Sequence, residues 1–172
     1  MSFLRLPARL VLGLPLLTGA CLIGQTAHPY AKAGPPTVSE LEKTFFAVLR
    51  SGDTLQFLSY VPEDGVNLGR DAEHATKTVI EEQLTKRTEL YCKLFDTSCL
   101  HTIPGAHAPA CSYRQLLNNS QKVRTASTKT TRNQVRQAIL VAEVQNDECG
   151  GHMLIDFIFN QQPDGWKLFS IP

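Results

Sequence analysis

Between residues 37 and 117, apolar residues recur at the three- and four-residue spacing of amphipathic helices. Thr37 and Glu40 form a capping-box pattern, in which both side chains satisfy free backbone N–H groups at a helix start. Gly52 is suited to end this helix, because glycine readily adopts the left-handed conformation. The apolar face between these signals comprises Leu41, Phe45, Val48 and Leu49. We therefore expect a first helix between Thr37 and Gly52.

Further helix and turn signals follow in the first half of the chain. The segment Asp53–Pro62 predicts a second, short helix, and Asp64–Gly65 predicts a turn before a short strand at Val66–Leu68. The capping-box pattern Thr78–Glu81 predicts the start of a longer helix, and Ser112–Leu117 a last short one. The longer helix would bury one face, made of Ile80, Leu84, Tyr91 and Phe95.

After residue 121 the period of the apolar residues changes to two, as in strands with one buried face. Strands are expected at 122–127, 135–145, 152–160 and 166–171. One face of the third carries Met153, Ile155, Phe157 and Phe159. The last three, joined by short turns, predict an antiparallel three-stranded meander. Helices first and strands last predict one α+β domain, residues 37–172, with N-terminal helices packed on an antiparallel sheet.

The N-terminal segment has the composition of a secretory signal. Arg5 and Arg9 precede an apolar run that is shorter than the roughly 20 residues of a membrane-spanning helix. We expect residues 1–20 to be a signal peptide and residues 21–36 to be a linker. The protein is then exported, to the periplasm or the outer cell envelope.

Three outcomes are open for processing of the signal. The segment Leu17–Cys21 resembles a bacterial lipobox, in which small residues precede a lipid-modified cysteine. Lipidation of Cys21 would tether the protein to a membrane without spanning it. Alternatively, ordinary cleavage occurs after Ala20 or after Ala33.

Four cysteines remain beyond Cys21, and an even number in an exported chain indicates disulfides. Three pairings are open. We favour Cys99–Cys111, which brackets a loop rich in turn residues, with Cys92–Cys149 as the second bridge. A zinc site is the weaker alternative, with two thiolates and two imidazoles as ligands: Cys99, His101, His107 and Cys111.

The charge is unevenly distributed, although 17 Lys and Arg nearly balance 16 Asp and Glu. The near-neutral total excludes a generally basic nucleic-acid binder. Residues 97–142 contain no acidic residue but six basic ones, Arg114, Lys122, Arg124, Lys129, Arg132 and Arg136. They predict a surface for an anionic ligand, a lipid head group or an acidic partner. Alternatively, they pair with the acidic segments across the sheet.

The C-terminal segment Asp164–Ile171, with its Asp-Gly-Trp-Lys sequence, resembles the last strand of the nuclear transport factor two-like superfamily. The resemblance implies a cystatin-like cone, with a curved sheet wrapped around helices. This superfamily includes ketosteroid isomerases, polyketide cyclases, dehydratases and non-enzymatic binding modules. The fold therefore does not determine the function.

Asp156 is the candidate catalytic residue. It lies between apolar neighbours in a predicted strand, where burial would raise the pKa of its carboxyl and suit it to acid–base catalysis. The isomerases of the resembling superfamily combine such an aspartate with a tyrosine donor, for which Tyr60 and Tyr91 are candidates. Alternatively, Asp156 faces solvent on an open sheet face.

These observations lead us to expect an exported, non-enzymatic binding module for a small ligand or a protein partner. The alternatives are a small isomerase- or cyclase-like enzyme that uses Asp156, and a purely structural envelope lipoprotein. No nucleotide-binding or nucleophile motif occurs, so no cofactor is expected. We expect no nucleic-acid partner. The chain could be tethered to a membrane through Cys21, and it could also form a homodimer.

Overall fold

The computed structural model describes residues 36–69, 73–100 and 111–172. The predicted signal peptide, most of the predicted linker and Cys21 lie outside these residues. None of the described helices has both the length and the apolar content that a membrane crossing requires.

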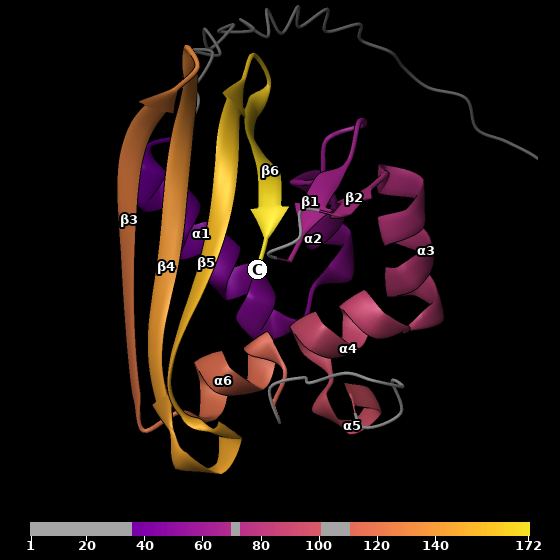
Figure 1. The fold of residues 1–172 in the computed structure, drawn as a ribbon, viewed down its shortest axis with the longest axis vertical. Helices are drawn as coiled ribbons and strands as arrows, with labels where there is room; N and C mark the ends of the chain where they lie inside the picture. Colours follow the sequence, from indigo (N-terminus) through magenta and orange to yellow (C-terminus); the bar gives the residue numbers. More distant parts are fainter. Residues whose placement is uncertain (1–35, 70–72, 101–110) are drawn as a thin grey trace, which may run out of the picture. The chain divides into compact units, whose positions relative to one another are not determined.

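The domain is α+β, with helices in the first part of the chain and a six-stranded sheet (Figure 1). The elements in chain order are α1 (Val38–Ser51), α2 (Thr54–Ser59), β1 (Val66–Leu68), β2 (Glu73–Ala75), α3 (Lys77–Lys86), α4 (Glu89–Phe95), α5 (Thr97–Leu100), α6 (Tyr113–Asn119), β3 (Lys122–Arg132), β4 (Val135–Asn146), the 3₁₀ helix η1 (Asp147–Cys149), β5 (Gly151–Gln162) and β6 (Gly165–Ile171).

The strands lie in the order β2-β1-β6-β5-β4-β3. Strands β3 to β6 form an antiparallel meander, which confirms the predicted meander and extends it by one strand. The expectation of a wholly antiparallel sheet is wrong, because β1 pairs with β6 in parallel. The sheet is therefore mixed.

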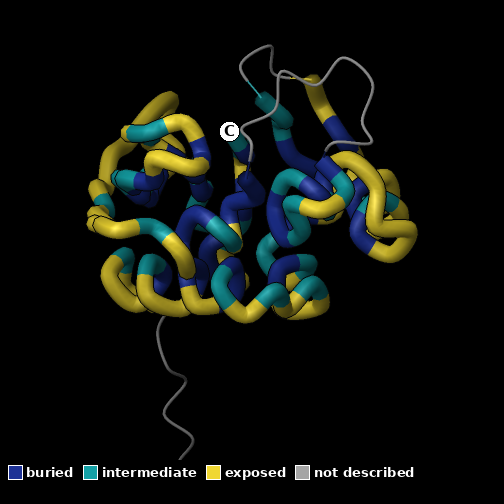
Figure 2. Tube along the Cα trace, turned by 90° about the horizontal axis from the view of Figure 1, so that it is seen from below, coloured by how far each residue is buried: buried dark blue, intermediate teal, exposed yellow. Residues whose placement is uncertain are grey.

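The alternation along β4 and β5 selects the face that the helices cover. Ala138, Leu140, Ala142 and Val144 of β4 are buried, and so are Ile155, Phe157 and Phe159 of β5. Figure 1 shows α1 running behind these strands, and Figure 2 shows the buried residues gathered toward the middle of the domain. Because neighbouring strands are in register, both strands contribute their inward residues to one apolar layer.

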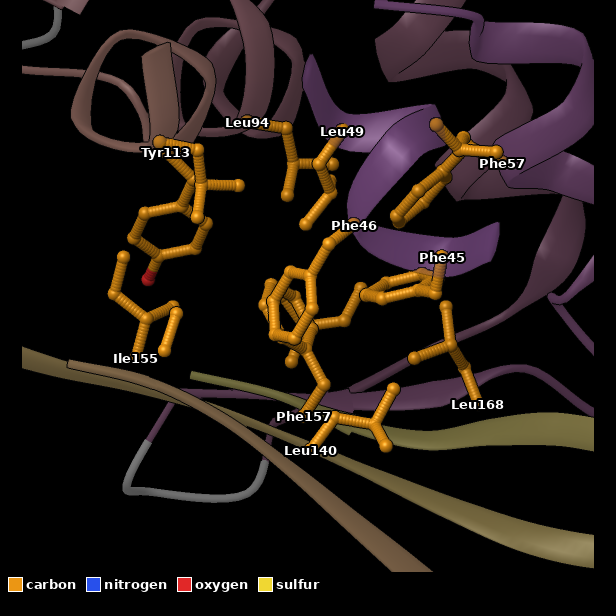
Figure 3. Packing of buried hydrophobic residues seen from close by; sticks show 14 of the residues in the cluster. Phe45, Phe46, Leu49, Phe57, Leu94, Tyr113, Leu140, Ile155, Phe157 and Leu168 are labelled. Carbon is orange, nitrogen blue, oxygen red and sulfur yellow. The ribbon is translucent and has the colours of Figure 1, made fainter. Parts of the chain in front are cut away.

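Helix α1 supplies the aromatic centre of the core, as the spacing predicted. The capping box between Thr37 and Glu40 is formed, and Gly52 ends the helix with a φ of 76°. The ring of Phe45 lies 4.9 Å from those of Phe157 and Phe159 on the sheet, and both contacts are edge-to-face (Figure 3). Such pairs add to the burial of apolar area that holds helix and sheet together.

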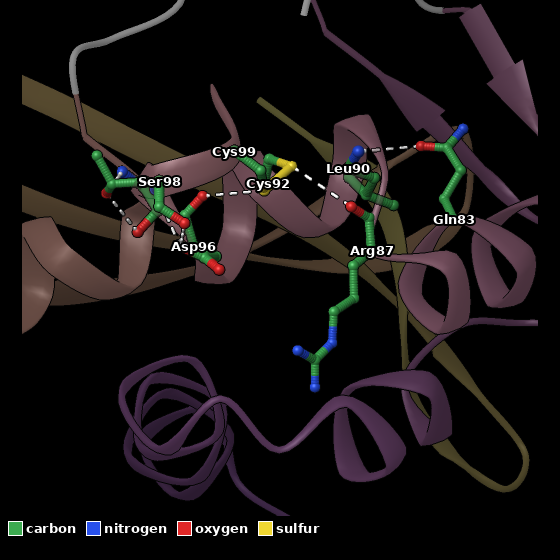
Figure 4. Close-up of a disulfide and its surroundings, with 9 residues drawn as sticks. Gln83, Arg87, Leu90, Cys92, Asp96, Ser98 and Cys99 are labelled. Atoms are coloured by element: carbon green, nitrogen blue, oxygen red, sulfur yellow. Dashed lines mark hydrogen bonds between the residues drawn. A yellow bond between two sulfur atoms is a disulfide. The ribbon is translucent and has the colours of Figure 1, made fainter. Parts of the chain in front are cut away.

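The single long helix expected from Thr78 is wrong, because the chain forms two helices. The first begins earlier than expected, with the hydroxyl of Thr76 accepting a hydrogen bond from the backbone N–H of Val79. It ends at Arg87, which adopts a left-handed φ of 54°. The side-chain oxygen of Gln83 then accepts a 3.0 Å hydrogen bond from the backbone N–H of Leu90 in α4 (Figure 4). This contact joins the two helices at the break.

The favoured disulfide pairing is also wrong. The bridges are Cys92–Cys99, with Cα atoms 5.4 Å apart, and Cys111–Cys149, with Cα atoms 5.5 Å apart. The first links α4 to α5 over a short distance along the chain (Figure 4). The second links the start of α6 to the turn between β4 and β5. Two disulfides are compatible with an extracellular or periplasmic protein.

Strand β6 is fastened to the N-terminal part of the domain. The indole N–H of Trp166 donates a 2.8 Å hydrogen bond to the carbonyl oxygen of Pro36. The backbone N–H of Leu168 donates a hydrogen bond to the backbone carbonyl oxygen of Tyr60. A bulge in the pairing of β5 with β6 falls between Ile158 and Phe159. The strand that carries the Asp-Gly-Trp-Lys sequence therefore closes the fold.

Candidate functional site

Asp156 does not lie in an apolar interior. Its neighbours Ile155 and Phe157 point into the core, so alternation places its side chain on the opposite face of the sheet, where it is exposed. Its partner across the strand pair is Val141 of β4. The structure thus contradicts the buried catalytic carboxylate and favours the alternative of an aspartate on an open sheet face.

The two tyrosine candidates lie on the helix side of the sheet, away from Asp156. Tyr60 follows α2, and its hydroxyl donates a 3.3 Å hydrogen bond to Thr44 while its ring packs against Phe45. Tyr91 is on α4, with the guanidinium of Arg87 5.4 Å from its ring centre. The structure therefore brings neither of the two candidate tyrosines to Asp156, whose charge acts instead on Tyr113 of α6 and contributes to raising its pKa.

Four of the six predicted basic residues lie on an edge strand of the sheet, and a fifth lies beside that strand on its neighbour. Strand β3 is the last strand and pairs only with β4 (Figure 1). It carries four of the cations, and the fifth follows the turn at the start of β4. All five are exposed: Lys122, Arg124, Lys129, Arg132 and Arg136. The edge therefore presents unpaired backbone groups and positive side chains together.

These cations are distributed over both faces of the sheet. Lys129 pairs with the buried Ala138, so it shares the face that the helices cover. Arg124 pairs with Glu143, on the opposite face. A flat anion-binding surface on one face is therefore not formed. What the residues share is the edge itself.

The cations of β3 form no ion pair within 4 Å of an acidic group in the described part of the chain. The nearest negative side chain by register is Glu143, whose carboxylate lies 2.9 Å from the imidazole of His152. That hydrogen bond chiefly lowers the pKa of Glu143, with smaller contributions from Arg124 and Lys122. Arg124 and Lys122 therefore act on Glu143 across the strand pair without a direct ion pair, whereas no acidic residue of β4 is the register partner of Lys129 or Arg132.

Arg114 belongs to a different part of the molecule. It lies on α6, and its Nε donates a 3.2 Å hydrogen bond to the carbonyl oxygen of Arg50 in the last turn of α1. The side-chain amide of Asn118 donates to the same oxygen at 3.1 Å. A side chain at Gly52 would approach the Arg114 guanidinium at 3.1 Å. Arg114 thus caps the end of α1 and does not belong to the cations of β3.

The predicted alternative of a zinc site lacks free thiolates to serve as ligands. Cys99 and Cys111 are both in disulfides, so neither is available as a thiolate. His101 and His107 lie outside the described residues. Among residues 36–69, 73–100 and 111–172, no group of three or more metal-ligating side chains is found.

Sequence reasoning missed the length of β3. The predicted strand ended at Ser127, whereas the observed strand continues to Arg132 and so brings Lys129 and Arg132 to the edge. The alternating β-branched residues after Ser127 were the signal that could have extended it.

Comparisons with protein-family models, curated proteins and solved structures found no match for this chain.

Proposed function

We propose that this protein is an exported, non-enzymatic binding module that docks an acidic, extended protein segment along β3. The observation that carries the proposal is an open edge strand whose four cations are exposed and form no ion pair with the described residues. An added strand gains main-chain hydrogen bonds from the edge, and its side chains supply specificity.

The distribution of the cations over both sheet faces fits this mode of binding. A strand added beside β3 places its own side chains alternately on both faces, next to those of β3. Acidic residues on one face would meet Lys122 and Arg124, and those on the other would meet Lys129. A ligand lying flat on either face would meet only part of the set.

The same charges disfavour a second copy as the partner at this edge. Two β3 strands side by side would bring like charges opposite each other, which is destabilising. Lysine and arginine on edge strands are a common protection against self-association. The expected homodimer therefore remains a separate prediction, which gel filtration tests directly.

The placement in the cell is part of the proposal. Two disulfides and the signal-like N-terminus support export to the periplasm or the outer envelope, with a membrane tether if Cys21 is lipidated. The purely structural envelope lipoprotein is the competing hypothesis. Helices on one face of the sheet and the Asp-Gly-Trp-Lys strand support membership of the nuclear transport factor two-like superfamily, which is proposed here for the fold alone.

The direct test is fluorescence anisotropy with a labelled peptide of the length of β3, rich in Glu and Thr. We expect saturable binding that weakens as salt is added, since exposed charges are screened. A peptide with Lys in place of Glu should not bind. A Glu peptide with N-methylated amides keeps the charge but loses its backbone donors, so it should bind at least tenfold more weakly.

A charge-reversal variant tests whether β3 is the surface that binds the acidic peptide. R124E/K129E changes one cation on each face of β3 and should weaken binding at least tenfold, about 1.4 kcal/mol or more. The matched control is K43E/K86E, which reverses two exposed charges on α1 and α3. If the methylated peptide binds as tightly as the unmethylated Glu peptide, strand addition is refuted. If R124E/K129E and K43E/K86E weaken peptide binding equally, β3 is not the binding surface.

A further inference from the structure

A pocket of about 420 Å³ lies between the β1–β2 hairpin, the helices α3 and α4, and the end of β6. This volume falls in the range of small-molecule sites, which combine mostly apolar walls with a few polar groups. The lining here is mixed: Leu68, Val79 and Leu90 supply apolar surface, and polar side chains of β2, α3 and α4 line the rest. The pocket is separate from the β3 edge, at the other end of the sheet order.

The basic residue that lines the pocket is Lys93. Its Nζ makes no hydrogen bond or ion pair with any described residue, and its contact is the ring of Tyr113, whose centre lies 5.9 Å away. Burial of the side chain lowers the pKa of Lys93, and the charge of Glu89 partly opposes this. Lys93 is half-buried and makes no direct ion pair with a described residue, and an anionic ligand in contact with it would offset the cost of burying its charge.

The acidic groups of the pocket are differently placed. Glu73 and Glu89 are exposed at its margin, where water screens their charge. His74 is exposed as well, and its Nε2 is held 2.6 Å from the carbonyl oxygen of Asp64. A charge interacts most strongly with the least solvated partner, so Lys93 dominates the recognition of a ligand inside the pocket.

We infer that this pocket binds a small carboxylate with an apolar body. The carboxylate pairs with Lys93, and the body lies against Leu68, Val79 and Leu90. The inference is independent of the acidic partner proposed for β3, because it uses none of the same residues.

The test compares hexanoate with its neutral and cationic counterparts, hexanamide and hexylamine, by NMR titration of the exported full chain. Hexanoate should shift the amide signals of β2, α3 and α4 saturably. Hexanamide should bind at least tenfold more weakly, and hexylamine more weakly than hexanoate. This comparison uses the wild-type protein and so does not depend on how a variant folds.

Two variants test whether the positive charge of Lys93 binds the carboxylate. K93M retains the aliphatic stem and should weaken hexanoate binding at least tenfold, whereas K86M, which removes an exposed ammonium on α3, should leave it unchanged. Circular dichroism verifies the folding of both. The inference is overturned if hexylamine binds as well as hexanoate, if the shifted signals lie outside the pocket, or if no saturation occurs up to about 10 mM.

Discussion

Removing each disulfide separately tests both the pairing and its contribution to stability. In the chain-entropy description, a bridge stabilises the fold by restricting the unfolded chain, and the effect grows with the loop that it closes. Cys111–Cys149 closes a loop of 38 residues and should contribute about 3.9 kcal/mol. Cys92–Cys99 closes a loop of 7 and should contribute about 2.4 kcal/mol. C111A/C149A should therefore be the less stable variant by about 1.5 kcal/mol.

The difference between the variants is more informative than either value, because each variant loses two sulfur atoms. Cys111 and Cys149 are both buried, while Cys99 is only half-buried, so any packing loss acts in the same direction as the loop effect. The assay is unfolding in guanidinium chloride without reductant. Loss of the longer loop should also raise the dependence of the unfolding free energy on denaturant, since the unfolded chain expands.

Thiol alkylation followed by peptide mass spectrometry tests the pairing itself. In C92A/C99A, Cys111 and Cys149 should stay bridged and resist alkylation. Free thiols at Cys111 and Cys149 would refute the observed pairing. If C92A/C99A is instead the less stable variant, the reasoning from loop length is wrong.

Three further predictions concern the fold. F45A should lower the free energy of unfolding by about 3–5 kcal/mol, measured in denaturant, because its ring contacts the sheet from the centre of the core. G65A should cost about 1–3 kcal/mol, seen as a lower midpoint of thermal unfolding, since a β-carbon at a φ of 96° would lie 2.1 Å from the Ala75 carbonyl oxygen. Hydrogen bonds from Thr37 lower the pKa of Glu40 below 4.5, so this carboxylate stabilises the fold above that pH and the stability is lost as pH falls through the lowered pKa. E40Q should flatten the stability profile in this acidic range, and an unchanged profile would contradict the assignment.

The candidate site shows how far sequence patterns reach. The acid-free segment identified the basic residues, because charge along a chain is visible without a fold. That they share an edge depends on β3 being the last strand and on its extension to Arg132. The pocket at Lys93 was not predicted, because it forms only when the segment from Leu68 to Lys93 folds back on itself and meets the end of β6. Likewise, Asp156 has apolar neighbours on both sides, and only the packing of the helices decides which face is interior.

The features that depend on neighbouring residues could be predicted before the fold was known. The capping signals located α1 and α6, and the change of period located the meander, because hydrogen bonds at helix ends and side-chain alternation act within a few residues. The tertiary structure decided the break at Arg87, the parallel pairing of β1 with β6, the disulfide partners and the exposure of Asp156. Each of these depends on which distant segments come into contact, and that is settled by burying the common apolar core rather than by local preference.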